Sequence, residues 1–105
     1  MKLDSQLEKI VSVIKTHYHP DKIILYGSYA YGTHDKNSDL DLLIIKDTRL
    51  PRHKRSRTIR KLLWGICDIP KDILVYTNKE IEEWKDVEQA FITEVVRKGK
   101  ILYEN

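Results

Sequence analysis

Hydrophobic residues early in the chain recur at steps of three and four, the spacing of one face of an amphipathic helix. The series comprises Leu3, Leu7, Ile10, Val11, Ile14 and Tyr18. The sequence His19-Pro20-Asp21 follows it, and a proline cannot continue a helix. The pattern therefore predicts a first helix over residues 3–18.

Three short apolar runs further along the chain are rich in residues that favour β-structure. They are Lys22 to Tyr26 (KIILY), Leu40 to Ile45 (LDLLII) and Asp72 to Tyr76 (DILVY). We expect each run to form a buried strand, and we expect a further extended segment from Lys100 to Tyr103 (KILY). Residues 27–38 connect the first two strands, with a turn of helix in the first half and turn-forming residues in the second.

A second helical pattern follows Pro51, because apolar residues again fall at i, i+3, i+4 and i+7. These residues are Ile59, Leu62, Leu63 and Ile66. The pattern predicts a helix that ends near Gly65-Ile66, with its basic residues on the outward face. Trp64 lies off the apolar stripe, which is compatible with contact to a partner.

The sequence Thr77-Asn78-Lys79-Glu80 has the form of a capping box and predicts the start of a last helix. The apolar stripe of this helix would be Ile81, Trp84, Val87, Phe91 and Val95. We expect Trp84 and Phe91 to lie in the core, and Gly99 to end the helix.

The order of elements predicts an α/β (α+β) fold, in which a small mixed sheet of three or four strands is flanked by helices and covered mainly on one side. The 105 residues correspond to a single domain, 1–105. No apolar run is long enough to span a bilayer and the start lacks a secretion signal, so we expect a cytoplasmic protein that does not bind membranes. The single cysteine, Cys67, predicts a buried, inert thiol.

Charge is unevenly distributed, although the net charge is only +3. The segment from Arg49 to Lys61 contains no acid, and its basic residues are Arg49, Arg52, Lys54, Arg55, Arg57, Arg60 and Lys61. The rest of the chain is therefore net acidic. The basic segment is either a solvated helix face or a surface for phosphate, RNA or an acidic partner.

The candidate chemistry lies at the ends of the predicted strands. Asp39 and Asp41 are two residues apart, so along a strand their side chains point to one face, with Cα atoms about 6.5–7 Å apart. Two such carboxylates repel, and a hard divalent cation such as Mg²⁺ relieves that repulsion. The pair therefore indicates a metal site.

Asp72 supplies a third carboxylate if the third strand lies beside the second. Three carboxylates around two Mg²⁺ ions would suit phosphoryl or nucleotidyl transfer, with Asp72 as general base. Gly27 lets the backbone approach a ligand, and the amide and hydroxyl of Ser28 suit phosphate oxygens. Asp68 is the rival third acid, and we interpret it as a loop residue.

Three motifs carry a resemblance to a known family. They are Gly27-Ser28-x-Ala30-x-Gly32, Ser38-Asp39-x-Asp41-Leu42 and Asp72-Ile73-Leu74-Val75. The segment from about Lys22 to Tyr76 resembles the minimal nucleotidyltransferases of the DNA polymerase β superfamily.

This resemblance implies a polymerase β palm-like fold. It also implies transfer of a nucleoside monophosphate from ATP or another nucleoside triphosphate to a hydroxyl, with release of pyrophosphate. Asp39, Asp41 and Asp72 would be the catalytic and metal-binding residues. The nucleotide-binding residues would be Gly27, Ser28, Tyr29 and Ser38.

Many family members of this size resemble antitoxins paired with a helical HEPN-type toxin, and some attach AMP to a tyrosine of that toxin. The resemblance therefore implies a protein acceptor. Tyr29 and Tyr31 depart from the pattern, because relatives often carry arginine there. Two alternatives stay open: an antitoxin that acts by occluding its partner, and a nucleic-acid-binding module that uses the basic helix.

Overall fold

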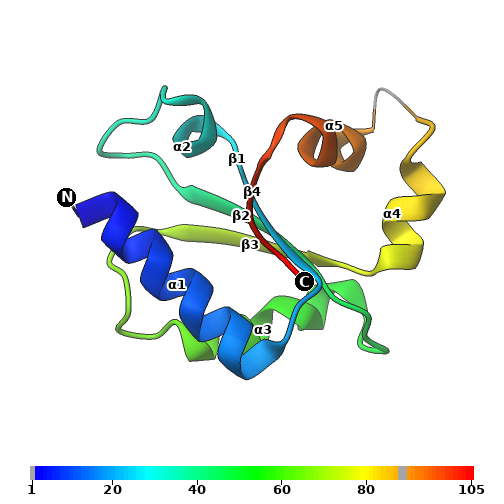
Figure 1. The fold of residues 1–105 in the computed structure, drawn as a ribbon, viewed down its shortest axis with the longest axis horizontal. Coiled ribbons are helices and arrows are strands. Elements are labelled where there is room, and N and C mark those ends of the chain that lie inside the picture. Colours follow the sequence, from blue (N-terminus) through cyan, green and yellow to red (C-terminus); the bar gives the residue numbers. More distant parts are fainter. Residues whose placement is uncertain (1, 88–89) are drawn as a thin grey trace.

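The computed structural model describes residues 2–87 and 90–105, which form a four-stranded sheet and five helices (Figure 1). In chain order the elements are α1 (Lys2–Tyr18), β1 (Lys22–Tyr26), α2 (Ser28–Tyr31), β2 (Leu40–Ile45), α3 (Arg52–Leu62), β3 (Lys71–Tyr76), α4 (Asn78–Trp84), α5 (Phe91–Lys98) and β4 (Lys100–Glu104). The bounds of β1 and β2 are those that the sequence predicts. β3 begins one residue earlier than predicted.

The sheet is mixed, with the strand order β3-β2-β1-β4. β1 pairs with β2 and with β4 in antiparallel fashion, whereas β2 and β3 are parallel and are connected through α3. The predicted extended segment at Lys100 is therefore the fourth strand. The prediction of a mixed sheet is confirmed.

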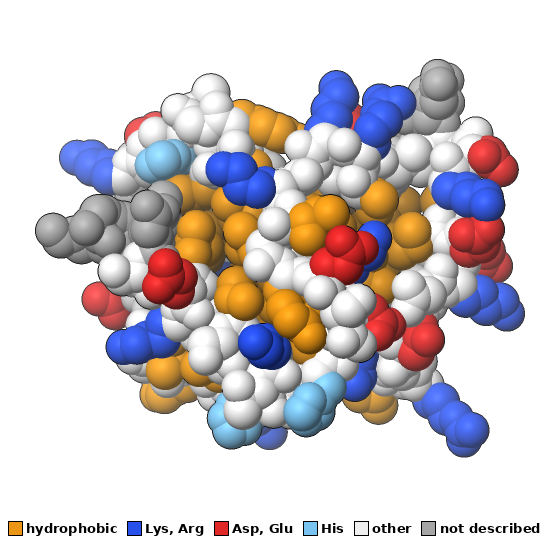
Figure 2. Space-filling view, in the orientation of Figure 1, with side chains coloured by type: hydrophobic (Ala, Val, Ile, Leu, Met, Phe, Trp, Pro, Cys, Tyr) orange, Lys and Arg blue, Asp and Glu red, His pale blue; other side chains and the backbone are white. Residues whose placement is uncertain are grey.

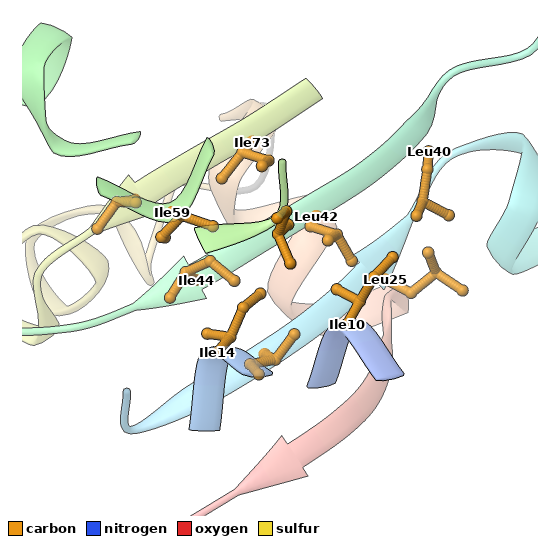
Figure 3. Close-up of a cluster of buried hydrophobic side chains, with 11 residues drawn as sticks. Ile10, Ile14, Leu25, Leu40, Leu42, Ile44, Ile59 and Ile73 are labelled. Carbon is orange, nitrogen blue, oxygen red and sulfur yellow. The ribbon is translucent and has the colours of Figure 1, made fainter. Parts of the chain in front are cut away.

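The larger core lies between one face of the sheet and the helices α1 and α3 (Figures 1 and 3). Figure 3 shows Ile10 and Ile14 of α1 pointing toward the strands and Ile59 of α3 packed beside them. Leu42 and Ile44 of β2 are fully buried in this cluster. The helical spacing of the first apolar series thus places α1 correctly.

The opposite face of the sheet carries a second, smaller core. Its buried residues are Ile24, Tyr26, Leu43, Ile45, Ile92 and Val95. The last two belong to α5, so helices pack on both faces, although the larger core lies on the α1 and α3 side as expected. β2 contributes to both cores, because its apolar residues from Leu42 to Ile45 alternate between the two faces.

The predicted last helix is two helices. The capping box at Thr77 and Glu80 is present, but α4 ends at Trp84 and α5 begins at Phe91, with residues 88–89 outside the described residues. The Thr93 hydroxyl of α5 donates to the Trp84 carbonyl at the end of α4. The expectation that both aromatic side chains are core is wrong, since Trp84 is 44% exposed and Phe91 54% exposed. Hydrophobic side chains also reach the surface between the charged ones in Figure 2.

The basic helix α3 ends at Leu62, and a turn continues to Ile66. The expectation that every charge of this helix faces outward is wrong for Arg55, because its side chain is buried. Its guanidinium donates to the carbonyls of Leu50 (2.8 Å) and Val75 (3.1 Å), and to the Glu80 carboxylate (2.6 Å). One basic side chain therefore joins α3, the end of β3 and α4.

Cys67 is half-buried rather than fully buried as expected, and its thiol donates to the Gln6 side chain at 3.1 Å. Among residues 2–87 and 90–105, none of the helices is both long and apolar enough to cross a bilayer.

Replacing Arg55 with alanine should lower the free energy of unfolding by about 3 kcal/mol. The substitution removes one partner of a partly buried ion pair and leaves the Val75 carbonyl without its donor. Urea unfolding at neutral pH measures the change. The control is Arg57→Ala, an exposed position on the same helix, which should change stability by no more than about 0.5 kcal/mol. Equal effects of the two substitutions would contradict the prediction.

Stability should also fall in acid through Glu80. Burial raises the pKa of this carboxyl, but hydrogen bonds from Arg55, the Thr77 amide and Arg52 outweigh burial and lower it from 4.5 to about 2. Because the folded pKa is the lower one, the stabilisation is complete above pH 4.5 and is lost as the pH falls toward 2. The stability difference between wild type and Glu80→Gln should shrink across that window. Glu83→Gln, at an exposed position of α4, should show no such dependence.

Candidate functional site

Three aspartates meet at one end of the sheet. Asp41 is the second residue of β2 and Asp72 the second residue of β3, and the parallel ladder places them directly opposite one another. Adjacent strands lie about 4.8 Å apart, so the two side chains are immediate neighbours on one face. Asp39 comes just before β2 and shares that face with Asp41 by alternation. The structure therefore brings together the three carboxylates that the sequence singles out.

The carboxylates lie on the face that α5 covers only in part. Alternation along β2 places Asp41 on the side of Leu43 and Ile45, which pack against α5. α2 follows β1 directly, and its residues Tyr29 and Ala30 pack against the larger core. Asp39 and Asp72 are exposed, whereas Asp41 is half-buried. The acidic end of the sheet is thus accessible to a large reactant.

Gly27 follows β1 and borders the Asp41 carboxylate. Tyr26 pairs with Asp41 across the antiparallel ladder, so the next backbone turn passes close to that side chain. Gly27 has φ +75°, and a Cβ atom at this position would overlap the Asp41 carboxylate. The position therefore requires glycine both for backbone conformation and for space.

The three carboxylates influence one another electrostatically. Burial raises the pKa of Asp41, and the nearby charges of Asp72 and Asp39 raise it further. Burial and the charges of Asp72 and Asp41 likewise raise the pKa of Tyr26. Burial and the neighbouring negative charges therefore both disfavour the ionised form of Asp41.

The donor set fits a hard divalent cation, because carboxylate oxygens are the ligands that Mg²⁺ prefers and a cation would relieve this repulsion. Among residues 2–87 and 90–105, however, no three His, Cys, Asp or Glu side chains converge closely enough to hold a metal ion in the present arrangement.

Ser28 and Ser38 lie near opposite ends of the connection between β1 and β2. Ser28 begins α2, directly after Gly27, and is half-buried. The Ser38 hydroxyl accepts from the Asp35 amide (2.9 Å) and donates to the Asp35 carboxylate (3.3 Å). Ser38 therefore closes the turn that leads into Asp39, and its hydroxyl is engaged within that turn.

Tyr29 packs on the larger core, and its ring stacks on His34 with centroids 4.1 Å apart. Tyr31 is 53% exposed. Sequence reasoning assigned no role to His34, and no spacing rule would have paired it with Tyr29. It also did not identify Tyr26 as a neighbour of the carboxylates, although that residue directly precedes Gly27 and ends a predicted strand. Asp68 is an exposed residue of the loop before β3, as predicted.

A nucleotidyltransferase family model matches the chain, and two archaeal proteins of similar sequence are named putative protein adenylyltransferases. The family model of polymerase beta nucleotidyltransferases matches residues 8–105. Putative protein adenylyltransferase MJ0604 of Methanocaldococcus jannaschii is 29% identical over 107 residues, which span 98% of this chain and 100% of the relative. Putative protein adenylyltransferase MJ0141 of the same organism is 35% identical over 79 residues, 75% of each chain.

Solved structures share the fold. A toxin-antitoxin crystal structure with AMP-PNP superposes with a TM-score of 0.67 at 24% identity, over 94% of this chain and 73% of the other. A putative nucleotidyltransferase from Sulfolobus solfataricus gives a TM-score of 0.56 at 14% identity, over 98% and 86% of the two chains. These likenesses confirm the expected nucleotidyltransferase fold. With the family match over most of its length, the chain belongs to the polymerase β nucleotidyltransferase family.

Proposed function

We propose that this chain is a Mg²⁺-dependent nucleotidyltransferase that moves AMP from ATP to a hydroxyl of a partner protein. The observation that carries the proposal is the register of β2 and β3, which sets Asp41 beside Asp72 at an accessible end of the sheet. The adenylyltransferase names of the two archaeal relatives support AMP as the transferred group.

The carboxylates divide the chemistry between them. Asp39, Asp41 and Asp72 would hold Mg²⁺, as two ions, and bound metal would neutralise charge that develops on the phosphate oxygens. Asp72 is exposed and can meet the acceptor, so it takes the proton of the incoming hydroxyl. A bond forms between the acceptor oxygen and the α-phosphorus while the bond to the β-phosphate oxygen breaks. Pyrophosphate leaves with that electron pair.

The residues around the carboxylates would bind the triphosphate or hold the segments that carry the site. Gly27 and Ser28 provide the turn that faces the triphosphate, where the lack of a side chain at Gly27 keeps the space beside Asp41 open. We assign Ser38 to positioning, since its hydroxyl holds the turn before Asp39. We assign Tyr29 the same kind of role for α2, because its ring is stacked on His34 and packed on the core.

We propose a protein as the acceptor, and the exposure of Asp39 and Asp72 makes the site accessible to a macromolecule. We propose a helical HEPN-type toxin as that protein, with this chain as the antitoxin, acting in the cytoplasm as a single domain. The toxin-antitoxin structures that share the fold support this assignment. A protein that works only by occlusion would not need three carboxylates in mutual repulsion.

The double substitution Asp39→Asn/Asp41→Asn should abolish transfer of label from α-labelled ATP to the purified partner in the presence of Mg²⁺. Neutral amides lose the charge that would hold the metal, so the rate should fall by about a thousandfold or more. Asp86→Asn, which changes an exposed acid in the turn after α4, is the matched control and should retain full activity.

Two outcomes would contradict the proposal. Label transfer that survives the double substitution would show that these carboxylates are not catalytic. A doubly substituted protein that still neutralises the partner in cells would favour occlusion.

Gly27→Ala should abolish activity while lowering stability only modestly. The added methyl group displaces the Asp41 carboxylate. Gly32→Ala is the matched control, because Gly32 has φ +76° and a Cβ atom there would meet no other atom within 4 Å. Both substitutions should cost about 1–3 kcal/mol of backbone strain in urea unfolding. Only Gly27→Ala should lose nucleotide transfer, and equal activity of the two variants would contradict a role for the close approach.

A further inference from the structure

The outward side of α3 and the turn after it combine basic side chains with one tryptophan. Arg57, Arg60, Lys61 and Trp64 recur at i, i+3, i+4 and i+7, so they form one stripe. This stripe lies opposite Ile59, which faces the core. Trp64 is 88% exposed. We call these four residues the basic-aromatic stripe.

Among the described residues, the cations of the stripe form no ion pairs, and Arg60 donates only to the Ser56 hydroxyl at 3.4 Å. Arg55 and Arg52 of the same helix pair with Glu80. Among the residues that the structure describes, Arg57, Arg60 and Lys61 have no acidic side chain within ion-pair distance. Three uncompensated cations on one helix face attract an acidic surface.

A groove of about 620 Å³ opens beside Trp64. Its apolar lining includes Leu63, Ile69, Pro70 and Ile73, and Arg60 lies at its edge. An exposed tryptophan next to an apolar groove is the arrangement that anchors many protein interfaces, whereas a single exposed aromatic on a convex surface needs no explanation. The groove therefore fits an apolar side chain from a partner.

We propose that the basic-aromatic stripe and its groove dock an acidic amphipathic helix of another protein. The acidic face would pair with Arg57 and Lys61, and an apolar side chain would enter the groove beside Trp64. The docking proposal does not depend on the proposed function. Only the further step, in which the docked protein is also the nucleotide acceptor, rests on that function.

The position of the groove suits an acceptor. The loop that lines it leads directly into β3, and the Lys71 ammonium holds that loop by donating to the carbonyls of Cys67 (2.8 Å) and Ile69 (3.0 Å). By alternation, Lys71 lies on the α3 side of β3 and Asp72 on the opposite side. Because β3 is an edge strand, a partner docked beside it can extend past that edge toward the face that carries Asp72.

A protein fits this surface better than RNA. Most of the side chains that line the groove are apolar, and the Lys71 ammonium in that lining already donates to two backbone carbonyls. Such a groove suits a hydrophobic side chain of a protein, whereas a phosphate chain gains its affinity from cations.

The test is fluorescence anisotropy with a fluorescein-labelled helical peptide of about 18 residues, with glutamates on one face and leucine and phenylalanine on the other. The wild-type chain should bind it in a saturable, salt-sensitive manner. Trp64→Ala, and separately Arg57→Glu/Lys61→Glu, should each weaken binding by about tenfold or more. Matched controls elsewhere on the surface are Trp84→Ala and Lys79→Glu/Lys100→Glu, which should bind as the wild type does.

A sister peptide with lysine in place of glutamate, and a single-stranded RNA of similar length, complete the design. Failure of the acidic peptide to bind, or equal binding by every variant, would overturn the proposal. Tighter binding of RNA that depends on Trp64 would overturn it in favour of a nucleic-acid surface. The assay contains neither ATP nor Mg²⁺, so its result is independent of whether the chain transfers AMP.

Discussion

The parallel pairing of β2 with β3 is the constraint on which the candidate site depends. Asp41 and Asp72 come from strands separated by the whole of α3, and only their register makes them neighbours. A shift of one residue would turn Asp72 to the opposite face of the sheet, because side chains alternate. The apolar residues after each aspartate prevent this shift. Ile73 and Val75 are buried in the larger core and would exchange places with Leu74 and Tyr76.

The connection between these strands is held by the ion pair of Arg55 with Glu80. Arg55 reaches the Val75 carbonyl at the end of β3, and Glu80 completes the capping box that begins α4. A single buried pair thus fixes the crossover helix, the strand that carries Asp72 and the start of the next helix. The basic segment has two roles, since some of its cations stabilise the fold and others remain on the surface.

Much of this arrangement could be predicted from particular residues. The runs KIILY and LDLLII predict two strands, and Gly27, Asp39 and Asp41 mark the strand ends that meet at the candidate site. Arg55 was missed because its charge suggested solvent, although it precedes Ile59 by four residues and so shares the buried face of α3. The break between α4 and α5 was missed because the apolar spacing continues across it. Exposed Trp84 and Phe91 show that periodicity alone does not establish burial.

The separation of charge supports the proposal that the carboxylates bind an external cation. Within residues 2–87 and 90–105, no lysine or arginine forms an ion pair with Asp39, Asp41 or Asp72. The concentrated cations lie on α3, which covers the opposite face of the sheet from these acids. Exposed ion pairs contribute little to stability, so the fold loses little by keeping these charges apart. The separation leaves the carboxylates free for the proposed cation and the basic side chains free for the proposed acidic partner.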